Sequence, residues 1–170
     1  MQLEEVVLVD DSDNPLGVME KLEAHRQGVL HRAFSVLLFN DEGQLLLQRR
    51  AKSKYHSAGL WTNTCCSHPR PDENIQLATE RRLAEEMGIS MSPEFLYSFK
   101  YKANLDSNLV EHEFDHVFTG VYNGIPNINP DEVADWRYTD LSDIRTDIDV
   151  NPGNYTAWFR LIMASLPERI

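Results

Sequence analysis

The chain has 170 residues, of which 42% are apolar and 25% are charged, and this composition predicts one globular domain over residues 1–170. Its net charge of −11 argues against nucleic acid or an anionic membrane as a partner. The longest apolar run, residues 33–39, is far shorter than the roughly 20 residues of a membrane-spanning helix. The chain begins without a basic signal segment and has only two cysteines, which are neighbours, so we expect a cytoplasmic protein with free thiols.

The N-terminal half of the sequence predicts strands joined by turns, with one short helix. In chain order we expect a strand at 5–10, a turn at 13–17, a helix at 19–25 that is ended by Gly28, and a hairpin of strands 31–40 and 44–50 around the turn sequence NDEG. The segment from residue 57 to residue 69 is rich in glycine and polar residues, which predicts a loop.

The C-terminal half contains the strongest helix signal, an amphipathic segment at 73–88 that closes on Gly88. The remaining elements are predicted to be strands at 95–103 and 109–122 joined by NLDSN, a strand at 132–140, a helix at 140–148 and a final helix at 154–166. Strands and helices therefore alternate without a regular β-α-β rhythm. This order predicts an α/β fold in which a mixed sheet lies between helices.

Two short stretches have unusual composition. Residues 49–54 read RRAKSK and place four cations within six residues of an acidic protein, which suits either a solvated loop or a phosphate-binding loop. Residues 62–69 read TNTCCSHP, which has too few ligands for a zinc finger. Taken alone, Cys66 can be a ligand, a nucleophile, an acid or a small buried residue.

Histidines and glutamates offer a candidate metal site. In the predicted strand VEHEFDH, alternation places Glu111 and Glu113 on one face and the two histidines on the other. Adjacent carboxylates repel each other unless a cation or a shared proton lies between them, and the alternative is a solvated strand face. If His25, His31 and His68 converge on these carboxylates, the mixed nitrogen and oxygen donors suit Zn²⁺, Mn²⁺ or Fe²⁺.

The 73–88 helix carries a degraded form of a known motif. A Nudix box reads G-x5-E-x7-R-E-U-x-E-E-x-G-U, where U is aliphatic, and most of it matches when Gly88 is set on the last glycine. The matching residues are Glu73, Arg81, Leu83, Glu85, Glu86 and Ile89. Ser67 replaces the first glycine, and Arg82 replaces a glutamate that binds metal in Nudix hydrolases. The arginine indicates a phosphate contact, or a weak ion pair of about 0.2–0.5 kcal/mol with the glutamate one turn later.

This box, together with segments along nearly the whole chain, resembles type I isopentenyl-diphosphate Δ-isomerase of the Nudix superfamily. The segments are MEKLEAH, LHRAFS, QRRAKSK, LWTNTCCSHP, YKA, EHE and AWF. The resemblance implies a Nudix-type mixed β-sheet sandwiched between helices. It also implies an enzyme of isoprenoid precursor biosynthesis that interconverts isopentenyl and dimethylallyl diphosphate by protonation and deprotonation through a tertiary carbocation.

The resemblance further implies the roles of individual residues. The catalytic residues would be Cys66, Glu113 and Tyr101. The diphosphate and hydrocarbon contacts would be Lys21, Arg50, Lys54, Arg82 and Trp158. A site for Mn²⁺, Zn²⁺ or Mg²⁺ would comprise His25, His31, His68, Glu111 and Glu113. A second site, for the Mg²⁺ that accompanies the diphosphate, would comprise Glu86 and the main-chain carbonyl of Cys66.

Three other functions compete with the isomerase. A Nudix pyrophosphohydrolase needs the carboxylate that Arg82 replaces, and a metal- or nucleotide-binding module without turnover has no need of Cys66 beside His68. A cysteine-dependent hydrolase lacks a recognisable oxyanion-stabilising motif. We therefore expect an isomerase that acts on a small diphosphate, and nothing in the sequence requires more than a monomer.

Overall fold

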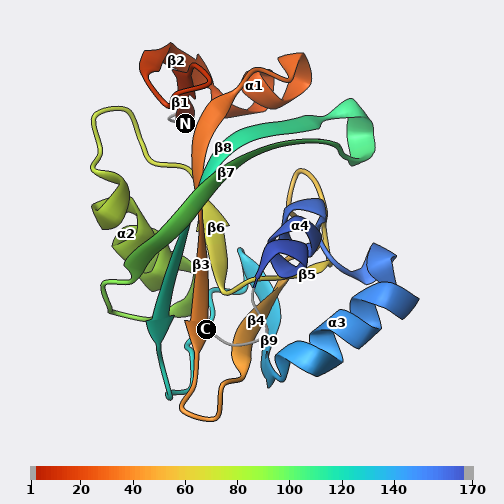
Figure 1. Cartoon of the computed structure of the whole chain (residues 1–170). Coiled ribbons are helices and arrows are strands. Elements are labelled where there is room, and N and C mark those ends of the chain that lie inside the picture. Colours follow the sequence, from red (N-terminus) through yellow and green to blue (C-terminus); the bar gives the residue numbers. More distant parts are fainter. Residues whose placement is uncertain (1–2, 167–170) are drawn as a thin grey trace.

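A computed structural model of the protein describes residues 3–166, and its centre is a nine-stranded mixed sheet (Figure 1). The strands are β1 Glu5–Val9, β2 Pro15–Glu20, β3 His31–Phe39, β4 Leu45–Arg50, β5 Trp61–Thr62, β6 Cys65–Ser67, β7 Glu94–Asn104, β8 Val110–Val121 and β9 Val133–Thr139. The α-helices are α1 Lys21–Gln27, α2 Ile75–Met87, α3 Leu141–Val150 and α4 Ala157–Ser165. No helix within residues 3–166 is long and apolar enough to cross a membrane.

Helices cover both faces of the sheet, as predicted, because the central strand β3 is apolar on both sides. Its Val36 and Leu38 pack in one cluster with Leu83 and Met87 of α2. Its Leu37 packs on the opposite face, in a cluster to which α4 contributes its buried apolar residues, Trp158, Phe159, Ile162 and Met163. Strands buried on both faces read as continuous apolar runs, and this explains the sequence of residues 33–39.

The predicted hairpin around NDEG forms, but its two strands soon separate. β3 and β4 are paired in the sheet only at Phe39 and Leu45, next to the turn. Beyond that point β3 pairs with β6 and, along its whole length, with the parallel strand β8, while β4 pairs with β9. Strands that are distant in sequence therefore lie beside β3, and they bring their side chains to it.

Two local predictions were wrong. The turn expected at 13–17 runs into strand β2, whose residues pair with β1. The segment 57–69, expected to be a loop, contains the short strands β5 and β6. Both strands are too short to show an alternating pattern, and their pairing with β4 and β3 is a property of the tertiary structure.

Helix α2 ends at Gly88 because this position has φ of 64° and faces neighbouring backbone. A Cβ atom added there would lie 2.5 Å from the carbonyl oxygen of Asn127. We expect Gly88→Ala to lower the free energy of unfolding by about 1–3 kcal/mol, from the left-handed backbone and this contact. Urea unfolding monitored by circular dichroism measures the change.

Gly153→Ala is the matched control, because a Cβ atom there meets nothing within 4 Å. Equal unfolding free energies for the two variants would contradict this account of Gly88.

Candidate active site

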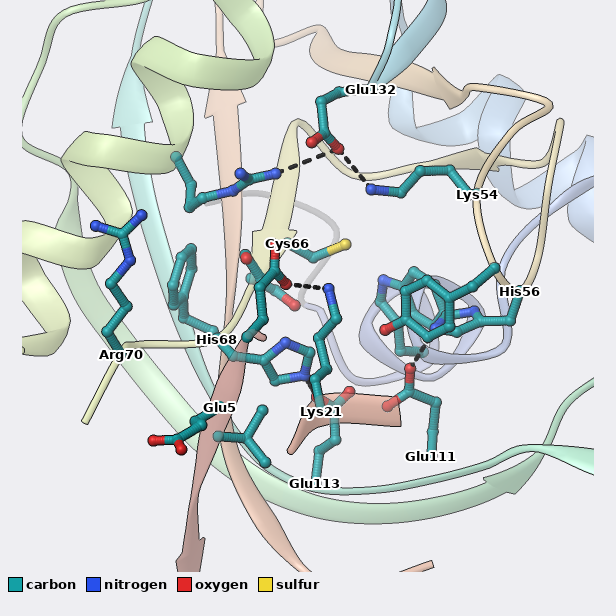
Figure 2. A pocket seen from close by; sticks show the side chains of 18 of the residues that line it. Glu5, Lys21, Lys54, His56, Cys66, His68, Arg70, Glu111, Glu113 and Glu132 are labelled. Carbon is teal, nitrogen blue, oxygen red and sulfur yellow. Dashed lines mark hydrogen bonds and ion pairs between the residues drawn. The ribbon is translucent and has the colours of Figure 1, made fainter. Parts of the chain in front are cut away.

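A cleft of about 880 Å³ brings most of the predicted functional residues together. Its lining includes Lys21, Arg50, Lys54, Cys66, His68, Arg82, Glu111, Glu113 and Trp158. The other four predicted residues are buried behind residues of this lining: His25, His31, Glu86 and Tyr101. In Figure 2, Lys54 and Glu132 point toward each other and Glu111 points toward His56, whereas Glu5 and Arg70 lie at the margin of the cleft.

Strand register places the central residues of the site. In the parallel pair of β3 and β8, His31 lies opposite Glu113, and in the antiparallel pair of β7 and β8, Tyr101 lies opposite the same glutamate. Cys66 lies opposite Ser35 in the pair of β6 and β3. Because side chains alternate along β8, Glu111 and Glu113 are buried on one face, as the sequence predicted.

Four residues hold candidate ligand atoms within 4.8 Å of one another: His25, His31, His68 and Glu111. Backbone carbonyls orient two of the rings, since His25 Nδ1 lies 2.7 Å from Lys21 O and His31 Nδ1 lies 2.8 Å from Val29 O. The Nε2 atoms of both rings are buried without a hydrogen-bond partner, and so is Glu111 Oε2. Oriented imidazoles whose buried nitrogens make no hydrogen bond and lie near carboxylate oxygens fit a divalent metal ion.

The protonation states of this group follow from burial and close contacts. Burial lowers the pKa of His68 to about 3, so its ring is neutral and able to donate an electron pair. Burial acts to raise the pKa of Glu111, but contacts with His25 and His56 outweigh it and hold the pKa well below its usual value. The group therefore combines a neutral imidazole with an ionised carboxylate, the forms in which these side chains bind metals.

Glu113 lies between this group and the cleft. Its Oε2 is 2.9 Å from His68 Nε2 and 3.5 Å from His31 Nε2, while its Oε1 accepts a hydrogen bond from the Tyr101 hydroxyl. Burial and the charge of Glu113 raise the pKa of Tyr101 well above its usual value, so the hydroxyl keeps its proton. Enclosure also raises the pKa of the Cys66 thiol, which is therefore protonated and able to act as an acid.

Carboxylates already pair with three of the four predicted cradle cations. Lys21 pairs with Glu4. Lys54 Nζ lies 2.5 Å from Glu132 Oε2 (Figure 2), and Arg82 Nη2 lies 3.3 Å from the same oxygen. Arg82 also contacts the two glutamates that follow it on α2, Glu85 at 2.7 Å and Glu86 at 3.0 Å. A diphosphate that bound here would exchange charged partners with these side chains.

The fourth cation, Arg50, is buried and its Nη2 donates to the carbonyl oxygen of His56 at 3.1 Å. Its guanidinium carbon lies 5.3 Å from the ring of Trp158. Trp158 itself is 3% exposed. Trp158 is therefore packed as a core aromatic, and it also lines the cleft.

The two adjacent cysteines have different surroundings because β6 alternates. Cys65 is fully buried against the α2 side of the sheet, and its thiol donates to Glu86 Oε2 at 2.7 Å. Cys66 packs against the opposite cluster and reaches the cleft. Both thiols are free.

Comparison with known proteins shows the family. The NUDIX domain matches residues 29–159. The isopentenyl-diphosphate Delta-isomerase of Pectobacterium atrosepticum is 51% identical over 168 residues, which cover 99% of this chain and 94% of that protein. Isopentenyl-diphosphate Delta-isomerase 1 of Aromatoleum aromaticum is 52% identical over 91% of this chain and 88% of its own length. The chain belongs to the isopentenyl-diphosphate Delta-isomerase family.

A solved structure supports the fold independently of this family. The protein DR0079 from Deinococcus radiodurans is 20% identical and superposes with a TM-score of 0.80 over 96% of this chain and all of that one. At this identity the likeness concerns the fold alone. Together with the NUDIX domain match, it confirms the predicted Nudix architecture of a mixed sheet between helices.

The sequence did not identify three residues of this isomerase-family site. Asp115 is buried on the same face of β8 as Glu111 and Glu113, and continuing their alternation by two residues would have found it. Glu132 lies in the connection before β9 and carries no local signal. His56, 3% exposed, lies 3.0 Å from Glu111 Oε1, and no motif in the sequence indicated this contact.

Proposed function

We propose that this protein interconverts isopentenyl diphosphate and dimethylallyl diphosphate, as its family indicates. The observation that carries this proposal is that a protonated thiol, Cys66, and a carboxylate, Glu113, line one cleft together with the four predicted cations. The reaction adds a proton to the terminal CH₂ carbon of the alkene and removes one from the CH₂ carbon that lies between the double bond and the carbon that bears the diphosphate oxygen. The substrate and product therefore have the same composition.

The two proton transfers need an acid and a base in one enclosed site, because protonation of the alkene produces a tertiary carbocation. We assign them to Cys66 and Glu113, and we assign to Tyr101 the role of proton partner to Glu113. The Tyr101 hydroxyl hydrogen-bonded to Glu113 supports that pairing. Trp158, which also lines the cleft, would shield the cation from water and stabilise it through its ring face.

The diphosphate would bind to Lys21, Arg50, Lys54 and Arg82. The negative diphosphate needs cationic side chains in order to bind to a protein of net charge −11. A divalent metal ion would neutralise part of the diphosphate charge and would be coordinated by carboxylates of the site. We assign Mg²⁺ to Glu86 and the Cys66 carbonyl, and Mn²⁺, Zn²⁺ or Mg²⁺ to His25, His31, His68, Glu111 and Glu113. The buried nitrogens of His25 and His31 that make no hydrogen bond support the second assignment.

We further propose that residues 1–170 form a single domain that works as a monomer in the cytoplasm and binds no nucleic acid. The continuous sheet from β2 to β9 supports the single domain, and the net charge of −11 supports the absence of a nucleic-acid partner.

The function is tested by incubating the protein with isopentenyl diphosphate and Mg²⁺ in heavy water and following the proton spectrum. The expected product is dimethylallyl diphosphate that carries deuterium. Release of phosphate or pyrophosphate without isomerisation would instead identify a hydrolase. The Arg82 side chain, which stands in the place of a metal-binding glutamate of the Nudix hydrolases, argues against that result.

A further inference from the structure

His56 lines the cleft and contacts both Glu111 of the candidate metal group and the ring of Trp158. It lies in the connection between β4 and β5 and is 3% exposed. Its Nε2 is 3.0 Å from Glu111 Oε1, a contact drawn as a dashed line in Figure 2. On its other side the imidazole meets the Trp158 ring edge-on, with 5.7 Å between ring centroids and an interplanar angle of 90°.

The hydrogen-bond partners of His56 define one tautomer. A carboxylate oxygen accepts hydrogen bonds, so the Nε2 atom that lies 3.0 Å from Glu111 Oε1 carries the proton and donates it. Nδ1 lies 3.0 Å from Ser57 Oγ and then accepts the hydroxyl proton. Both ring nitrogens of this buried side chain are therefore satisfied, and the ring cannot rotate without breaking both contacts.

The backbone around His56 is held in an unfavourable conformation. Ser57 is a buried serine with φ of 51°, in the left-handed region that non-glycine residues seldom adopt. Its N–H donates to Asp106 Oδ1 at 3.0 Å, from the tip of the β7–β8 hairpin. The carbonyl of His56 accepts from Arg50. A conformation that costs free energy is thus maintained by contacts from two other parts of the fold.

We propose that His56 is a positioning residue that orients Glu111 for metal binding and couples this carboxylate to Trp158 and Arg50. The proposal rests on the metal group of the proposed function. His56 donates to Glu111 Oε1, which also lies 3.3 Å from His25 Nε2, and Oε2 is left as the buried oxygen without a hydrogen bond. Donors that hold a ligating carboxylate or imidazole in place commonly change metal affinity by about 10–100-fold when they are removed.

A pair of variants separates the Glu111 contact from simple packing. The amide nitrogen of His56→Gln reaches the position of Nε2 and can donate to Glu111, whereas the shorter His56→Asn can reach only the position of Nδ1 beside Ser57. His116→Asn is the matched control, because His116 lies on the opposite face of β8 and contacts Asp13 at 2.8 Å. Thermal unfolding of each metal-free variant verifies that it is folded.

The measurement is the affinity of the metal-free protein for Mn²⁺, in competition with a chromophoric chelator. We expect His56→Asn to bind about 10–100-fold more weakly than wild type, and His56→Gln and His116→Asn to stay within a few-fold of it. In turnover, His56→Asn should also lower kcat at saturating Mn²⁺, because Trp158 and Arg50 lose a fixed neighbour.

Two results would overturn the inference. Wild-type Mn²⁺ affinity in a folded His56→Asn variant would show that metal binding by Glu111 does not depend on His56. Equal weakening of Mn²⁺ binding in His56→Asn and His56→Gln would show that the hydrogen bond donated to Glu111 is not the cause. Both results are independent of isomerase turnover by the wild type, and that turnover tests the proposed function separately. Binding that Glu111→Gln does not weaken would overturn the metal group and this inference with it.

Discussion

Replacing Glu113 with glutamine is expected to lower kcat by about 10⁴-fold, the largest effect of any single change in the site. The carboxamide is close in size to the carboxylate but takes up no proton. It also cannot accept hydrogen bonds on both sides, from Tyr101 and from the imidazole of His68, as the carboxylate does. Initial rates of dimethylallyl diphosphate formation at saturating Mg²⁺ and Mn²⁺ measure the loss.

Glu5→Gln is the control for this variant, since Glu5 also lines the cleft but is exposed and comes from β1. It should retain activity within a few-fold of wild type. If Glu113→Gln kept more than about one tenth of wild-type kcat, Glu113 would be neither the acid nor the base of the reaction.

Replacing Cys66 with alanine is expected to reduce kcat by about 10³-fold and to leave the KM for the diphosphate within a few-fold of wild type. The thiol lines the cleft and its raised pKa keeps it protonated, whereas the cations predicted to bind the diphosphate come from other elements. Deuterium incorporation from heavy water, followed by proton spectroscopy, tests whether either proton transfer survives without it.

Ser67→Ala is the appropriate comparison, because Ser67 is the neighbouring residue of β6 and also lines the cleft. We expect Ser67→Ala to incorporate deuterium and to form product at nearly the wild-type rates. If Cys66→Ala rapidly incorporated deuterium into the substrate but formed no product, only one of the two proton transfers would have been lost. Undiminished turnover by this variant would exclude Cys66 from the chemistry.

Much of the fold could be predicted because its signals are local. Helix α2 was expected at 73–88 and spans Ile75–Met87, since its apolar stripe and the glycine after it are properties of adjacent residues. The two long strands β7 and β8 were expected from alternation and are present. The short strands β5 and β6 could not be predicted, because two or three residues carry no periodicity and form strands only beside β4 and β3.

The sequence by itself determined the family, the α/β class and the shared face of Glu111 and Glu113, because motif residues and strand alternation depend on positions along the chain. Only the tertiary structure decided that His31 and Tyr101 both lie opposite Glu113, and that Glu132 lies between Lys54 and Arg82. It also decided that His56 reaches Glu111. Such contacts depend on the register between strands and on loop paths, which are set by packing of the whole sheet and leave no periodic signal in one sequence.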